Sequence, residues 1–245
     1  MLLLVGWYIR EKVAESPDFV AVKHQPQSAP PLMAVFRDHP VQLLAVAGAR
    51  LAEVTWFYTI ATFSLAYATS TLGIPKQTVL GAVVWGAAVA MFTMPICGWL
   101  GDKIGQRRMF AFGTIGLMIF ALVFFHLLQT RESVWITLAM VISIGIVYSM
   151  LYGPEGALFS AQFKPEVRYT GISIGVQVSG AIGGGLAPMI ATSLLAVGDG
   201  DPFYINCYLM MLGGIALVSL WAMRGVSGNE LGAQLSTSKE SLSLK

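Results

Sequence analysis

Residues 98–108 read Gly-Trp-Leu-Gly-Asp-Lys-Ile-Gly-Gln-Arg-Arg, and this stretch decides the fold. A long apolar run ends just before it and another begins just after it. Between the two runs, seven residues hold one acid and three bases, as in a short cytoplasmic loop between two membrane helices. Charge alone would fit any cytoplasmic loop, but the glycines let helix ends approach closely and the backbone turn sharply. We therefore predict a tight basic turn.

The composition of the chain is that of an integral membrane protein. Of its 245 residues, 56% are hydrophobic and 11% are charged, and the mean hydropathy is +0.69. Soluble domains carry roughly 25% charged residues, so a soluble fold of this size has no way to bury so much apolar surface. The apolar runs are long enough for membrane helices and lack the alternation of barrel strands. We predict an all-α membrane protein.

The apolar runs predict a bundle of six transmembrane helices. We place them at 41–68, 77–100, 109–129, 134–160, 169–196 and 203–224. Residues 40–225 would form this six-helix unit. Before it we expect the tail of a preceding membrane helix at 1–9 and a polar cytoplasmic linker at 10–39. After it we expect a disordered cytoplasmic tail at 226–245.

The distribution of Lys and Arg orients this unit in the membrane. Twelve of these bases lie in the linker, the second and fourth loops and the tail, which all share one side. Two, Lys76 and Arg131, lie on the opposite side, and Arg50 lies within a span. Because cytoplasmic loops carry the excess of Lys and Arg, both ends of the unit are expected to face the cytoplasm.

Arg50 and Glu53 are charged residues about nine and twelve positions into the first span. At 1.5 Å per residue they lie roughly 14 to 18 Å deep, near the middle of the membrane. A charge at that depth must face the bundle interior or a water-filled cavity and needs a partner. The spacing puts both residues on one helix face, within pairing reach. Either Arg50 attracts an anionic substrate while Glu53 pairs with it or carries a proton, or the two form a structural ion pair.

Two further polar residues lie inside predicted spans. Glu155 follows Pro154 between two glycines and lies about nine residues before Lys164, so it is roughly 13 Å inside that end of its span. It is a candidate proton-binding carboxyl, although it would also fit a helix kink whose acid faces water. Gln177 is the amide of the fifth span that lies deep enough to touch a substrate.

The chain offers no constellation for catalysis or metal binding. One histidine, His126, lies within a span, and no nucleophile has a base at a suitable spacing. Cys97 and Cys207 lie inside apolar runs and lack metal-ligand spacing. We therefore expect no enzyme activity, no cofactor, no metal and no nucleic-acid partner.

The basic turn closely resembles the loop motif of the major facilitator superfamily, G-x-L-[SG]-D-[RK]-x-G-[RK]-[RK]. In that family the motif joins the second and third helices of each six-helix half, and Gln106 stands where a base is common. The resemblance implies a gating role for eight residues of the loop and its surroundings: Gly98, Gly101, Asp102, Lys103, Gly105, Arg107, Arg108 and Arg168. The bases among them would pair with Asp102 or Glu166.

Three other segments resemble the metabolite:proton symporter branch of the same family. Residues 7–19 resemble the segment that follows helix six, and the run 48–53 with Tyr58 resembles helix seven. Residues 163–175 resemble the signature that joins helices ten and eleven. The chain departs from that signature at Ala161, where the family usually has glutamate, and at Val176, where it often has tyrosine.

The resemblance implies a secondary active transporter of a small organic acid or zwitterionic metabolite, with the proton as coupling ion and alternating access. Together with their depth in the spans, this makes Arg50, Glu53, Tyr58, Glu155 and Gln177 the residues predicted for substrate and proton coupling. The match covers the C-terminal six helices of a twelve-helix fold, so we expect a truncated half in the bacterial inner membrane. It would need membrane lipid and either an N-terminal half or a second copy. The alternatives are a non-transporting half-bundle and a channel-like pore.

Overall fold

The computed structural model describes residues 31–223, which form six helical spans long and apolar enough to cross a membrane. The ends of each predicted span agree with one of them within three residues, except that the second helix runs on to Ile104. Helical hydrogen bonding satisfies the backbone polar groups that lipid cannot. The predicted all-α fold class is confirmed. The helix tail predicted at 1–9 and the tail at 226–245 lie outside the described residues.

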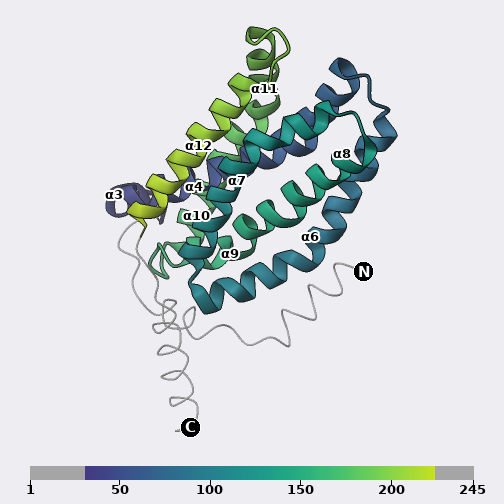
Figure 1. Ribbon diagram of the computed structural model, residues 1–245. Coiled ribbons are helices and arrows are strands. Elements are labelled where there is room, and N and C mark those ends of the chain that lie inside the picture. The colour runs from purple at the N-terminus through teal and green to yellow at the C-terminus, as the bar shows by residue number, and fades with distance from the viewer. Residues whose placement is uncertain (1–30, 224–245) are drawn as a thin grey trace, which may run out of the picture.

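Spans that follow each other in the chain run antiparallel, and all six pack into one bundle (Figure 1). Their elements, after the short helix α3 (Pro31–Asp38), are α4 (Pro40–Tyr58), η1 (Thr59–Phe63), α5 (Ser64–Ala66), η2 (Tyr67–Thr71), α6 (Lys76–Ile104), α7 (Gln106–Gln129), α8 (Ser133–Met140), η3 (Val141–Tyr148), α9 (Ser149–Ser160), α10 (Arg168–Ser179), η4 (Gly180–Gly184), α11 (Gly185–Val197) and α12 (Phe203–Ala222). The η segments are π-helical turns within otherwise α-helical spans.

The end of the predicted linker is helical. Residues 10–39 are polar and contain four prolines, which predicted an irregular segment, but α3 occupies Pro31–Asp38. Its Val35 side chain is fully buried, and α3 packs against α4 and α10. This packing explains the difference, since tertiary contacts stabilise a short helix that local composition does not favour.

The first span is central to the bundle, because α4 packs against both α12 and α10. Small residues allow the close approach: a Cβ at Gly175 would come within 2.8 Å of Val46. The Ser179 hydroxyl donates a hydrogen bond to the Ala47 carbonyl across the same contact, at 2.8 Å. Small side chains and interhelical hydrogen bonds are the usual means of helix association in lipid, where no hydrophobic force drives helices together.

The spans α6 and η3–α9 approach each other even more closely. A Cβ at Gly153 would lie 2.8 Å from the Met94 carbonyl oxygen and 2.9 Å from the Gly98 backbone nitrogen. A Cβ at Gly86 would lie 2.8 Å from the Met140 carbonyl oxygen. The two backbones therefore touch, and glycine is required at these contacts.

The basic turn has the tight geometry that its sequence predicts. Gly105 alone separates α6 from α7, and its φ of +103° lies in a region that residues with a side chain rarely adopt. The turn places the charged residues of 102–108 at one end of the bundle.

Gly153 and Gly156 of α9 provide a matched test of this packing. Gly153→Ala should lower the free energy of unfolding by about 1–3 kcal/mol, because the added methyl group meets the α6 backbone. Gly156→Ala should cause no loss, because nothing lies within 4 Å of a Cβ there and alanine favours the helix. Thermal unfolding of both variants in detergent measures the difference, and equal melting temperatures would contradict the backbone contact.

Candidate functional site

Arg50 and Glu53 form an ion pair within α4, as their spacing predicts. The Arg50 Nη1 atom lies 2.5 Å from the Glu53 Oε2 atom. The Glu53 side chain is 1% exposed and the Arg50 side chain 15% exposed, so the pair lies inside the bundle and not on its lipid surface. Burial at this depth excludes water from most of the pair.

Glu155 joins the pair from a different span. Its Oε2 atom lies 2.6 Å from the same Arg50 nitrogen, and its side chain is 10% exposed. We call Arg50, Glu53 and Glu155 the Arg50 triad. The triad brings one positive and two negative groups together, so it carries a net negative charge when both carboxylates are ionised.

The packing of α9 orients Glu155 towards α4. Successive residues of an α-helix are about 100° apart, so Gly153 and Glu155 project from nearly opposite faces. Because Gly153 is pressed against α6, Glu155 is turned away from α6 and meets Arg50. The helix continues through Pro154 without ending there.

A cavity of about 390 Å³ opens beside the triad. It is lined by residues of the first, fourth and fifth spans: Arg50, Glu53, Val54, Phe57, Tyr58, Tyr148, Tyr152, Val176, Gln177 and Gly180. Four of the five residues predicted for substrate and proton coupling therefore line one cavity, and the fifth, Glu155, borders it through Arg50. Val176, where the chain departs from the symporter signature, also lines it.

Aromatic residues that the sequence analysis did not select form one wall of the cavity. The rings of Tyr148 and Tyr152 stack with centroids 5.4 Å apart, and Phe57 lies 4.9 Å from Tyr148. The Arg50 guanidinium carbon lies 5.8 Å from the Tyr152 ring centroid, within the range of a cation–π contact. The spacing of Tyr148, Tyr152 and Glu155, four and then three residues, places them on one helix face and is the signal that identifies them.

Each span that lines the cavity contains a π-helical segment next to it. The segment η1 begins just after Tyr58, η3 ends at Tyr148 and η4 begins at Gly180. The other three described spans, built on α6, α7 and α12, are α-helical from Lys76, Gln106 and Phe203 onwards. Such turns are rare in proteins and are frequent at functional sites.

One donor of the triad has no partner. The Arg50 Nε atom is buried and makes no hydrogen bond to any residue in 31–223. A buried donor without a partner is costly, so the close contacts of Arg50 with the two carboxylates are made through its terminal nitrogen alone.

The predicted gating residues lie apart from the cavity, at the end of the bundle where α6 and α7 meet. Asp102 accepts a hydrogen bond from the Gln106 side chain, so the uncharged residue at the usual base position is its partner. The Lys103 ammonium lies 3.8 Å from the centroid of the Trp99 ring. Arg107 donates to the Trp221 carbonyl at 3.4 Å, which connects the turn to α12.

Of the remaining gating residues, the glycines make close packing contacts and the two arginines lie at the starts of helices. A Cβ at Gly98 would come within 3.4 Å of the Gly153 carbonyl oxygen, and Gly101 lies directly beneath the Gln106 amide. Arg108 is exposed on the first turn of α7, and Arg168 begins α10. Within residues 31–223, no ion pair joins Arg107 or Arg108 to Asp102 or Glu166.

Comparison with known proteins gives consistent matches over most of the chain. The family model described as "Major Facilitator Superfamily" matches residues 1–188. The shikimate transporter of Escherichia coli is 28% identical over 213 residues, which are 86% of this chain and 49% of the relative. The alpha-ketoglutarate permease of E. coli is 30% identical over 190 residues, 77% of this chain and 43% of the relative.

A putative proline/betaine transporter of Staphylococcus aureus (strain COL) is 26% identical over 221 residues, 88% of this chain and 46% of the relative. The chain therefore spans about half the length of the curated relatives it matches. No solved structure matches it. The matched family and relatives are transporters and not enzymes. On the evidence of the family model, the six-helix bundle and the transporter relatives, this multi-pass membrane chain belongs to the Major Facilitator Superfamily.

Proposed function

We propose that the chain is the C-terminal half of a secondary active transporter that moves a small organic acid or zwitterionic metabolite together with a proton. The observation that carries the proposal is the Arg50 triad, buried at membrane depth beside a cavity. Ionisable groups in such positions mark substrate and proton pathways in membrane proteins. The relatives that transport shikimate, alpha-ketoglutarate or proline and betaine support this class of substrate.

The charge count of the triad supplies a mechanism for coupling. With both carboxylates ionised, Arg50 is held on two sides and the site carries one excess negative charge, which repels an anion. A proton on Glu53 or Glu155 removes that excess charge and weakens one of the two contacts. The guanidinium is then free to bind the carboxylate of a substrate. Because coupling is reciprocal, bound substrate strengthens proton binding by the same factor, typically 5- to 150-fold.

The rest of the cavity suits a small polar molecule. The Gln177 amide and the Tyr58 hydroxyl provide neutral hydrogen-bonding groups, and the rings of Tyr148 and Tyr152 provide apolar faces. A few polar groups among aromatic side chains are typical of sites for small ligands. A zwitterion would place its acid on Arg50 and its cationic group against the ionised carboxylate.

We further propose that the bundle needs a second six-helix unit, either an N-terminal half or another copy of the chain. Tyr58 and Tyr152 line the cavity yet are 39% and 45% exposed, so the cavity is open on one side. In transporters built from repeats, the site lies between two units that rock against each other. The basic end of the bundle would face the cytoplasm of a bacterial inner membrane, with the C-terminus on that side.

Glu53→Gln tests the proton site. In a complex with a six-helix partner, the variant should fold normally but lose the dependence of uptake on the proton gradient, because a neutral amide cannot exchange a proton at this position. Uptake into proteoliposomes with and without an imposed pH gradient measures the effect. Glu155→Gln is the matched comparison, and coupling that survives Glu53→Gln but not Glu155→Gln would move the proton to Glu155.

Replacement of the charged side chains of the triad tests its burial independently of transport. Arg50→Ala should destabilise the fold by about 3–5 kcal/mol, since it leaves two carboxylates buried without a cation. The triple variant Arg50→Gln, Glu53→Gln, Glu155→Gln should recover most of that loss, because it leaves no buried charge. Thermal unfolding in detergent measures both, and an Arg50→Ala variant as stable as the parent would show that the triad is accessible to water.

The 245-residue chain alone, as a proven monomer, should show no uptake of a relative's substrate, because its cavity is open along one side. Transport assays on liposomes with single-molecule counting of subunits measure this. Saturable, gradient-driven uptake by a monomer would overturn the need for a second unit.

A further inference from the structure

The helix α3 has three distinct faces. Val35 is fully buried against the bundle. The side chains of Leu32, Met33 and Phe36 are apolar and are each more than half exposed. Arg37 and Asp38 are strongly exposed and charged. At 100° per residue, Leu32, Phe36 and Met33 fall within one arc of about 100° between the buried and the charged faces.

The position of α3 along the bundle places this apolar arc at the edge of the bilayer. Arg50 lies ten residues beyond Pro40, the first residue of α4, which corresponds to about 15 Å. That distance is half the hydrocarbon core, which is about 30 Å thick. Pro40 begins the first span that can cross a membrane, so α3 lies immediately outside that span.

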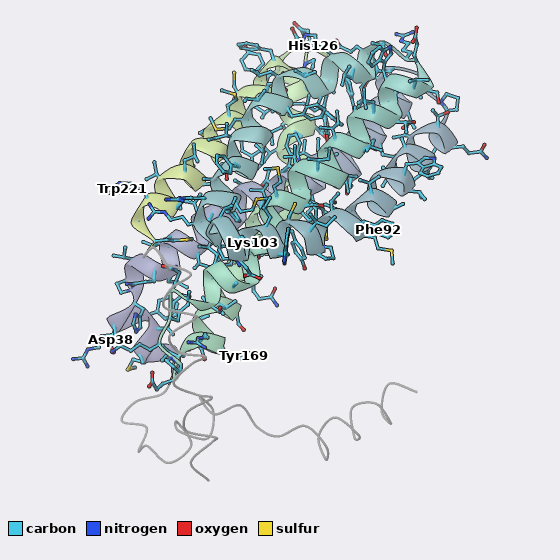
Figure 2. All side chains as sticks on the ribbon, turned by 60° about the horizontal axis from the view of Figure 1, so that its bottom comes forward. Asp38, Phe92, Lys103, His126, Tyr169 and Trp221 are labelled. Atoms are coloured by element: carbon cyan, nitrogen blue, oxygen red, sulfur yellow. The ribbon has the colours of Figure 1, made fainter. Side chains whose placement is uncertain are left out.

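Exposed aromatic residues mark the same level. Figure 2 shows Asp38 and Tyr169 towards one end of the bundle and His126 at the other end. Tyr169 lies in the first turn of α10 and Trp221 in the last turn of α12, and both are strongly exposed. Exposed Tyr and Trp at helix ends are typical of the interface between lipid and water.

The apolar surface of α3 continues onto exposed apolar residues at the start of α4. Val41 and Leu44, in the first turns of α4, are also apolar and more than half exposed. The junction between the helices is fixed: the Leu43 amide donates to the His39 carbonyl at 3.0 Å, and the His39 ring packs edge-on against Phe163 at 6.2 Å. The arc of α3 therefore has a set orientation, continuous with the exposed apolar surface at the start of the first span.

We propose that α3 is an interfacial helix that inserts Leu32, Met33 and Phe36 into the headgroup region of the bilayer. Arg37 and Asp38 then remain in water, with Arg37 within reach of lipid phosphates. Amphipathic helices bind membranes in this way, with one apolar face at the boundary between headgroups and acyl chains. The occupant of the exposed arc is thus the bilayer itself, and the proposal does not depend on the transport proposal.

Spin labels on α3 in the full chain test this proposal. Cys97 and Cys207 are first replaced by alanine, and single cysteines are introduced as Phe36→Cys and, for comparison, Asp38→Cys. The labelled chains are placed in vesicles of phosphatidylethanolamine and phosphatidylglycerol. Collision with oxygen, which concentrates in lipid, is compared with collision with a water-soluble nickel complex.

The label at position 36 should collide at least threefold more with oxygen, relative to nickel, than the label at position 38. A nickel-accessible label at 36 would place the arc in water and overturn the proposal. A label at 36 that is shielded from both reagents would place it under another polypeptide and also overturn it. Leu32→Cys repeats the measurement on the same arc should Phe36→Cys fail to fold.

Discussion

A positive charge at the centre of a bilayer requires negative partners, and Arg50 has two of them on different spans. Such a network adds little net stability, because removing charges from water costs about as much as their attraction returns. The network instead specifies how the spans pack against each other. Any arrangement that separates α9 from α4 strands a charge in lipid, so the packing of these two spans is strongly specified even though the contact itself is weak.

Close helix packing at glycine residues brings the charged groups of the Arg50 triad together. The contact of Gly153 with α6 fixes the rotation of α9, and the rotation of α9 directs Glu155 towards α4. On the other side, small residues bring α10 close to α4, which places Gln177 in the same cavity. The polar site is thus positioned by small residues elsewhere in the bundle, which lack the side chains that would keep the helices apart. In lipid this is an effective route, since close backbone contact gains dispersion energy that no hydrophobic force supplies.

The sequence predicts what depends on local composition. Hydropathy places the six spans, charge and glycine spacing place the turn around Gly105, and a spacing of three predicts the pairing of Arg50 with Glu53. The partner of Glu155 was not predictable, because it depends on how two spans distant in the sequence rotate against each other. The helix α3 was missed for a similar reason: Val35 is buried by neighbouring spans, which the proline-rich composition around it does not reveal.

The pairing of Asp102 with Gln106 was also not predicted, although both residues belong to the turn. An acid followed by bases predicts an ion pair, but Asp102 is near the end of α6 and Gln106 begins α7, and the turn at Gly105 brings their side chains together. The geometry of the turn therefore determines this contact in place of longer-range electrostatics. As a result, the charged side chains of Lys103 and Arg107 are free to contact Trp99 and the end of α12.

The π-helical segments have a consequence for how these spans tolerate insertions and deletions. A π turn closes its hydrogen bond over five residues where an α turn uses four, so it holds one extra residue. Loss of a single residue from η1, η3 or η4 would leave an ordinary α turn and would not rotate the rest of that span. Loss of a residue from an α-helical part of the same span would instead rotate everything beyond it by about 100°, so that residues there would exchange lipid for protein as neighbours. For the same reason, a helical wheel drawn through Tyr58, Tyr148 or Gly180 misplaces one end of its span.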